Sequence, residues 1–169
     1  MNETSDVHSK AKKGIYILII SVTKPSVVNV GQLGELQLLP GMYLYVGSAL
    51  GMGSTSLQHR LARHQLKKKC MKKHWHIDFI TTLPHAKVHF IVVMETSRRL
   101  ECLLSKHIAQ LDGVGCPLKG FGSSDCSQCE THFYSYAKNI EQAVKACNNI
   151  VQKLGIKPKI ISTEVHSSK

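Results

Sequence analysis

The order of hydrophobic and polar positions predicts a sheet that begins early in the chain. The run from Gly14 to Val22 is rich in Ile, Tyr and Val, which is typical of a strand. Residues 35–39 alternate polar and apolar side chains, and residues 42–47 follow the turn signal Pro40-Gly41, so both segments are expected to be strands. Residues 86–94 are expected to form a central strand, and residues 132–136 a short one.

Three segments instead carry apolar residues at helical spacing. One helix is expected from about Ser54 to Lys69, a second after Thr96 or Ser97, and a third over residues 139–154. The second has an apolar stripe made of Leu100, Leu103, Leu104, Ile108 and Leu111. This order of elements predicts an α+β fold, a small, mostly antiparallel sheet flanked by helices.

The polar ends of the chain suggest one domain with two tails. We expect a flexible N-terminal tail over residues 1–13, a single domain over residues 14–155 and a C-terminal tail over residues 156–169. Within the second tail, Ile160 and Ile161 could add an edge strand. No apolar run approaches the roughly 20 residues that a membrane span needs, and no secretion signal is evident. We therefore expect a cytoplasmic protein without a membrane partner.

Composition points to a polyanionic partner. Lysine and arginine number 22 against 11 acidic residues, which gives a net charge of +11. This excess favours nucleic acid. The expected phosphate contacts are Lys67, Lys68, Lys69, Lys72 and Lys73, although a solvated helix end would have the same composition.

Five residues in a fixed order resemble the signature of the GIY-YIG nuclease superfamily. They belong to Gly14-Ile15-Tyr16, Tyr45-Val46-Gly47, a helix with Arg60 and His64, and a helix with Glu101. Further motifs resemble an uncharacterised prokaryotic branch that is sometimes fused to an endonuclease-III-like DNA glycosylase: Gly47-Ser48-Ala49, His74-Trp75-His76-Ile77-Asp78, Glu101-Cys102 and Gly120-Phe121-Gly122-Ser123-Ser124-Asp125-Cys126. The segment between the first two signature motifs is longer than is usual in the superfamily.

This resemblance implies an endonuclease that cleaves DNA with Mg²⁺ or Mn²⁺, in repair or recombination. It implies that Glu101 holds the metal, Tyr16 and Tyr45 are the base and its neighbour, Arg60 stabilises charge, and His64 relays a proton or contacts phosphate. From the residues alone, the tyrosines could be ordinary strand aromatics and His64 a surface side chain. RNA remains a possible substrate, and the alternative function is a non-catalytic nucleic-acid-binding module.

The cysteines suggest a second kind of site. Cys70, Cys102 and Cys147 each lie within a helical pattern and are interpreted as small hydrophobic residues in a reduced protein. Cys126-x-x-Cys129-x-x-His132 has ligands that suit zinc, with Cys116, His74 or His76 as a possible fourth. The alternative is a structural or substrate-binding loop. Asp78 is expected to orient one of the two histidines near it.

Overall fold

Strand β1, Gly14–Val22, lies in the interior of a six-stranded sheet. The structure is a computed structural model, and it describes residues 12–65 and 72–164. Its other strands are β2 Ser26–Asn29, β3 Glu35–Leu38, β4 Gly41–Ala49, β5 Ala86–Glu95, β6 Val114–Gly115, β7 Phe133–Tyr136 and β8 Lys159–Ser162. Its helices are α1 Leu57–Gln65, α2 Asp78–Thr81, α3 Glu101–Ala109 and α4 Ile140–Lys153, with short 3₁₀ turns at Gly31–Leu33 and Gly53–Thr55.

The large sheet has the order β6-β7-β4-β1-β5-β8, and each of its neighbouring strand pairs is antiparallel. β2 and β3 form a separate hairpin, which accounts for the long segment between the two tyrosine motifs. Val28, Leu36 and Leu38 of this hairpin are buried against the main core. The predicted α+β fold is confirmed, including its antiparallel sheet.

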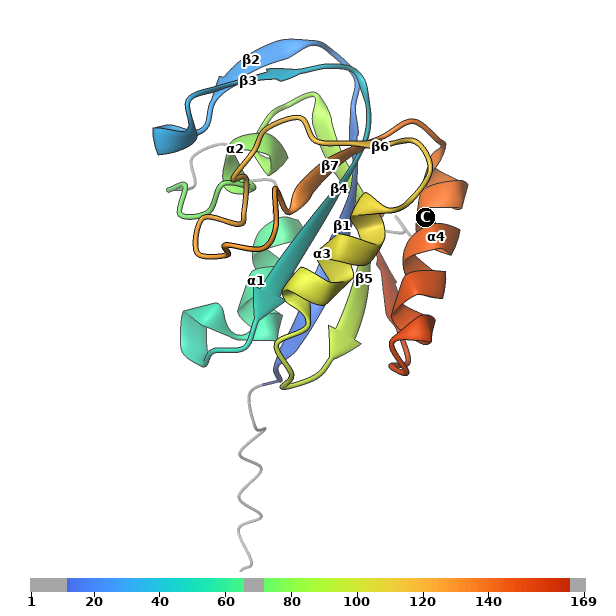
Figure 1. Cartoon of the computed structure of the whole chain (residues 1–169). Coiled ribbons are helices and arrows are strands. Elements are labelled where there is room, and N and C mark those ends of the chain that lie inside the picture. The colour runs from blue at the N-terminus through green and yellow to red at the C-terminus, as the bar shows by residue number, and fades with distance from the viewer. Residues whose placement is uncertain (1–11, 66–71, 165–169) are drawn as a thin grey trace, which may run out of the picture.

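Alternate residues of β1 enter two different cores, because side chains alternate across a strand. Tyr16, Leu18 and Ile20 pack on the face that carries α1 and α2. Ile15, Ile17 and Ile19 pack on the face covered by α3 and α4. Figure 1 shows this arrangement, with the sheet between the two sets of helices. The apolar stripes predicted for the second and third helices therefore face the second core, except for Leu103, which is 42% exposed, so that its inclusion in the stripe of the second helix is wrong.

The predicted tails are partly wrong where the structure describes them. β8 pairs with β5, with Ile161 opposite Ile91, so the possible edge strand is present and residues 159–162 are not a tail. Pairing supplies these residues with the backbone hydrogen bonds that a tail would make with water. At the other end, the carbonyl groups of Lys12 and Lys13 accept hydrogen bonds from Leu57 and Thr96. Residues 1–11 and 165–169 lie outside the described part of the chain.

Within residues 12–65 and 72–164, no helix has both the length and the apolar character that a membrane span requires.

Gly47 makes room for the ring of Tyr16. The β1–β4 register places the two residues opposite each other. A Cβ atom at Gly47 would lie 2.5 Å from Tyr16 Cζ and 2.6 Å from its hydroxyl oxygen. Real side chains do not approach so closely, so any larger residue would displace the Tyr16 ring.

We predict that Gly47→Ala lowers the free energy of unfolding by about 1–3 kcal/mol, because it overpacks a fully buried contact. The measurement is urea denaturation followed by circular dichroism. Gly115→Ala is the matched control, since its Cβ would meet only the rotatable Ser135 hydroxyl within 4 Å. Equal stability of the two variants would contradict the role given to Gly47.

Candidate functional site

A cavity of about 450 Å³ brings together three of the five signature side chains. Tyr45 from β4, Arg60 from α1 and Glu101 from α3 all line it. A second cavity of about 520 Å³ shares Glu101 and Asp125 with the first. Glu101 is therefore a common border of both cavities.

Arg60 is the most unusual of these side chains because it is a buried cation. It is 6% exposed. Nη2 donates to the Ser48 carbonyl at 3.4 Å, and Cζ lies 3.7 Å from the centre of the Trp75 ring. Nη1 has no hydrogen-bond partner among the described residues. A buried guanidinium with a free donor is costly, and an anion in the cavity would satisfy it.

Tyr16 and His64 form a buried pair behind the cavity. The Tyr16 hydroxyl and His64 Nε2 are 2.9 Å apart, and His64 is 5% exposed, so the interpretation of His64 as a surface residue is wrong. Burial, and then the positive charge of Arg60, lower the pKa of His64 to about 3, which keeps its imidazole neutral. Burial raises the pKa of Tyr16 to about 12, against the opposing effect of Arg60.

The two tyrosines have different positions. Tyr45 lines the cavity, whereas Tyr16 is fully buried and does not. Burial also raises the pKa of Tyr45 well above its ordinary value, and neither hydroxyl is ionised at neutral pH. Tyr43, on the same face of β4, exchanges hydrogen bonds with the backbone of Leu39 instead.

The His74–Asp78 segment forms one wall of the cavity, and a buried ion pair between Asp78 and Arg63 holds it in place. Asp78 is fully buried and accepts hydrogen bonds from the Arg63 guanidinium and from the backbone N–H groups of His74 and Trp75. The expectation that Asp78 orients a histidine ring is therefore wrong. Its carboxylate is occupied by the Arg63 guanidinium and by the backbone N–H groups of its own turn. Asp78 instead fixes Trp75, against which Arg60 lies.

The segment from Gly120 closes the same cavity from the other side. Phe121 is fully buried against Tyr45 and Phe133. The Gly122 N–H donates to His76 Nδ1 at 3.0 Å, which joins this loop to the preceding wall. Gly122 has a φ of +72°, and a Cβ there would lie 2.9 Å from the Tyr45 ring. The glycine is required by both its backbone conformation and its neighbour.

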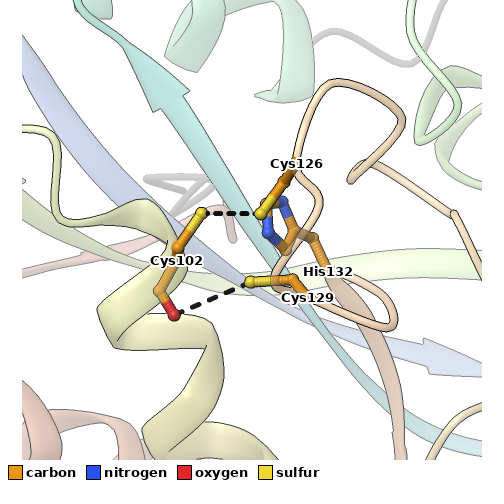
Figure 2. Close-up of side chains that lie close together, drawn as sticks. All are labelled: Cys102, Cys126, Cys129 and His132. Atoms are coloured by element: carbon orange, nitrogen blue, oxygen red, sulfur yellow. Dashed lines mark hydrogen bonds between the residues drawn. The ribbon is translucent and has the colours of Figure 1, made fainter.

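A cluster of three cysteines and a histidine adjoins Glu101. The ligand atoms of Cys102, Cys126, Cys129 and His132 all lie within 4.8 Å of one another, an arrangement that could hold a metal ion. Figure 2 shows the side chains converging, Cys102 from α3 and the others from the loop that leads into β7. Cys102 Sγ lies 3.0 Å from Cys126 Sγ, and the Cys129 thiol lies 3.8 Å from the Cys102 carbonyl oxygen.

The fourth member of the cluster differs from the expected one: it is Cys102 and not Cys116, His74 or His76. The interpretation of Cys102 as a small hydrophobic residue is wrong, because Cys102 is the cysteine that joins the other three residues. Cys116 is exposed and outside the cluster, and neither His74 nor His76 belongs to it. Helical spacing missed Cys102 because the residue sits at the first turn of α3, where a side chain can reach beyond the core. Its place directly after Glu101 was the available signal. Cys147, by contrast, is buried in the core as predicted.

The thiols of the cluster are electrostatically coupled. Hydrogen bonding from Cys102, helped by the backbone N–H of Gln128, lowers the pKa of Cys126 to about 7. The same hydrogen bond raises the pKa of Cys102, so the thiols do not ionise independently. His132 is 1% exposed, and neither ring nitrogen has a hydrogen-bond partner in the described chain.

The predicted lysines are only partly described. Lys72 and Lys73 are exposed, and they precede the His74–Asp78 wall of the cavity. Lys67, Lys68 and Lys69 lie outside the described residues.

We predict that Asp78→Asn destabilises the protein by about 3 kcal/mol at pH 7, because it leaves the Arg63 charge without its partner. Burial alone would raise the pKa of Asp78, but the hydrogen bonds from Arg63, His74 and Trp75 outweigh it and lower the pKa below 3.8. The stabilisation is thus present above pH 4 and is lost as the pH falls below it. The difference between wild type and variant should shrink from pH 5 to pH 2 in urea denaturation.

Asp112→Asn is the control, because its carboxylate is 91% exposed and pairs with Lys138 at the surface. Its stability should match the wild type across this range. A pH-independent difference for Asp78→Asn would contradict the linkage.

The comparisons with known proteins give one family. Residues 15–156 match the family described as domain of unknown function DUF123. Comparison with curated proteins and with solved structures found no match. The family match extends from β1 to just beyond α4, and it includes Tyr16, Tyr45, Arg60, His64 and Glu101 together with the cluster of Cys102, Cys126, Cys129 and His132. Since the match covers most of its length, the chain belongs to the DUF123 family.

Proposed function

We propose that this protein is a divalent-metal-dependent endonuclease that hydrolyses phosphodiester bonds in DNA, in repair or recombination. The observation that carries the proposal is the buried Arg60, which lines one cavity with Tyr45 and Glu101 and whose Nη1 has no hydrogen-bond partner among the described residues. The resemblance to GIY-YIG nucleases and the net charge of +11 support the same function.

Phosphodiester hydrolysis requires an oriented water and relief of the charge that develops on phosphate. Arg60 would bind the scissile phosphate through its planar guanidinium, which Trp75 holds in place. Because Tyr45 lines the cavity and Tyr16 does not, we assign the orientation of water to the Tyr45 hydroxyl. The Tyr16–His64 pair would support the site from behind, where His64 is neutral.

Glu101 fits the part of a magnesium ligand. Mg²⁺ is commonly held by one or two carboxylates, with waters and substrate phosphates completing its shell. The Glu101 side chain is 26% exposed and lines both cavities, where Asp125 offers a second carboxylate. A bound Mg²⁺ or Mn²⁺ would supply Lewis-acid chemistry and a more acidic water.

Zinc is the second cofactor that we propose, at a different place. Three thiolates and one imidazole form a donor set of structural zinc sites, and hard cations such as Mg²⁺ prefer oxygen. Cys102, Cys126, Cys129 and His132 supply these four ligands. The buried His132 supports this assignment, because neither ring nitrogen makes a hydrogen bond within the described chain and only Nδ1 has an ion-pair contact, with Glu101.

Cleavage assays on DNA duplexes, flaps, four-way junctions and structured RNA, with Mg²⁺ or Mn²⁺, test the nuclease. Arg60→Lys should reduce the cleavage rate by about 100-fold, because it keeps the charge but loses the bidentate donors. Glu101→Ala should abolish cleavage. Glu130→Ala is the control, since that carboxylate is 57% exposed and pairs with Lys119. A wild-type protein that binds these substrates tightly without cutting any of them would instead favour the non-catalytic binding module.

Binding has its own prediction. The double variant Lys72→Ala/Lys73→Ala should weaken DNA binding and reduce the slope of log affinity against log salt by about 2, if each lysine contacts one phosphate. Fluorescence anisotropy over a range of salt concentrations measures this slope. Lys153→Ala on α4 is the control, because α4 packs on the opposite face of the sheet from α1. An unchanged slope would remove both lysines from the interface.

A further inference from the structure

We infer that the metal centre at Cys102, Cys126, Cys129 and His132 controls the position of Glu101 through His132, so that one carboxylate serves both the metal centre and the cavity. The inference deepens the proposed function and rests on it only for the part that Glu101 plays in cleavage. The link between the metal centre and Glu101 concerns metal binding alone and does not depend on whether DNA is cut.

Glu101 lies between the Arg60 cavity and the cysteine cluster, as its neighbours in sequence and in space show. It begins α3, and the next residue is the ligand Cys102. Its Oε1 lies 3.2 Å from His132 Nδ1. The carboxylate lines the cavity of Arg60 and Tyr45 and also the cavity bordered by Cys102, Cys126 and His132. A movement of its side chain would alter both sites.

The buried His132 imidazole lies between the three cysteines and Glu101. The imidazole is 1% exposed, and both ring nitrogens lack a hydrogen bond, even though Nδ1 is close to Glu101. Its backbone is fixed on both sides, because its N–H donates to Phe121 and its carbonyl accepts from Val46. The ring therefore cannot move out to water with ease. A metal on one nitrogen and a hydrogen bond from the other to Glu101 would satisfy both donor and acceptor capacity.

Carboxylate partners of this kind orient metal-bound histidines and strengthen metal binding. The coupling is reciprocal, because any preference of the metal for one Glu101 position is also a preference of that position for the metal. A bound metal would thus hold the carboxylate beside His132 at the edge of the Arg60 cavity. It would also fasten the first turn of α3 to the 126–132 loop, which supplies the remaining ligands.

The sulfur positions allow one competing chemistry. Cys102 and Cys126 are near enough for oxidation to a disulfide, which would consume two ligands and release two electrons to an oxidant. A disulfide would leave the His132 nitrogen that does not face Glu101 without a metal or a hydrogen-bond partner among the described residues. The buried histidine therefore favours the metal centre.

The first experiment measures metal in the full chain purified without added zinc. We expect one equivalent of zinc by elemental analysis, and visible absorption bands of tetrahedral thiolate coordination after replacement by Co²⁺. Cys102→Ser should lose the stoichiometric metal, whereas Cys116→Ser, which alters an exposed cysteine outside the cluster, should retain it. Protein without stoichiometric metal, or with a Cys102–Cys126 disulfide found by mass spectrometry, would overturn the metal centre.

The second experiment tests the link through Glu101. Competition with a chromophoric chelator should show that Glu101→Ala reduces zinc affinity by about 10- to 100-fold. The affinity of Glu101→Gln should lie between those of the wild type and Glu101→Ala. Glu130→Ala should bind zinc as the wild type does. Wild-type affinity in Glu101→Ala would overturn the link while leaving the zinc assignment intact. Normal zinc behaviour in a protein that cuts no substrate would remove only the nuclease, so the two failures are distinguishable.

Discussion

The burial of β1 on both faces is the constraint on which the rest of the structure depends. A strand without a solvent-facing side must be covered by helices on each face, and here α1 and α2 cover one face while α3 and α4 cover the other. Tyr16 belongs to the first core and reaches His64 on α1. The second core anchors α3 through Leu104 and Ile108, which leaves its first turn free to carry Glu101 and Cys102 to the cavity edge. Both candidate sites therefore follow from how this strand is buried.

The candidate site combines buried polar groups that lack partners, which costs free energy, with surrounding contacts that hold these groups in position. Arg60 is a buried cation with an unpartnered nitrogen, and His132, at the adjoining second cavity, is a buried imidazole whose ring makes no hydrogen bond to any described residue. Around them, Asp78 with Arg63, the His76–Gly122 hydrogen bond and the packing of Phe121 are fully satisfied contacts. Unsatisfied polar groups inside an otherwise satisfied frame are typical of binding sites, because a ligand can supply what the fold does not. This contrast gives the proposed phosphate position at Arg60 and the proposed metal position at His132 their physical basis.

Sequence motifs and roles do not correspond one to one in this protein. The His74–Asp78 motif contains two histidines, but its most constrained side chain is the carboxylate of Asp78, which organises the turn. Glu101 and Cys102 are simply neighbouring helix residues in the sequence, yet the border of the cavity and the cluster of cysteines with His132 meet at these two positions. Within Tyr45-Val46-Gly47, the glycine is required by the ring of Tyr16, thirty-one positions earlier in the chain.

Local pattern determined much of the fold, because strand alternation and helical spacing are set by backbone geometry and by which side chains avoid water. The sequence thus predicted β1 to its ends, the antiparallel sheet, the stripe of α4 and all of the α3 stripe but Leu103. It also placed Arg60 and His64 on one helical face. Only the tertiary structure decided that Tyr45 rather than Tyr16 faces the cavity, that His64 is buried, and that Cys102 joins Cys126, Cys129 and His132. These outcomes depend on contacts between residues far apart in the chain, and no spacing along one element contains them.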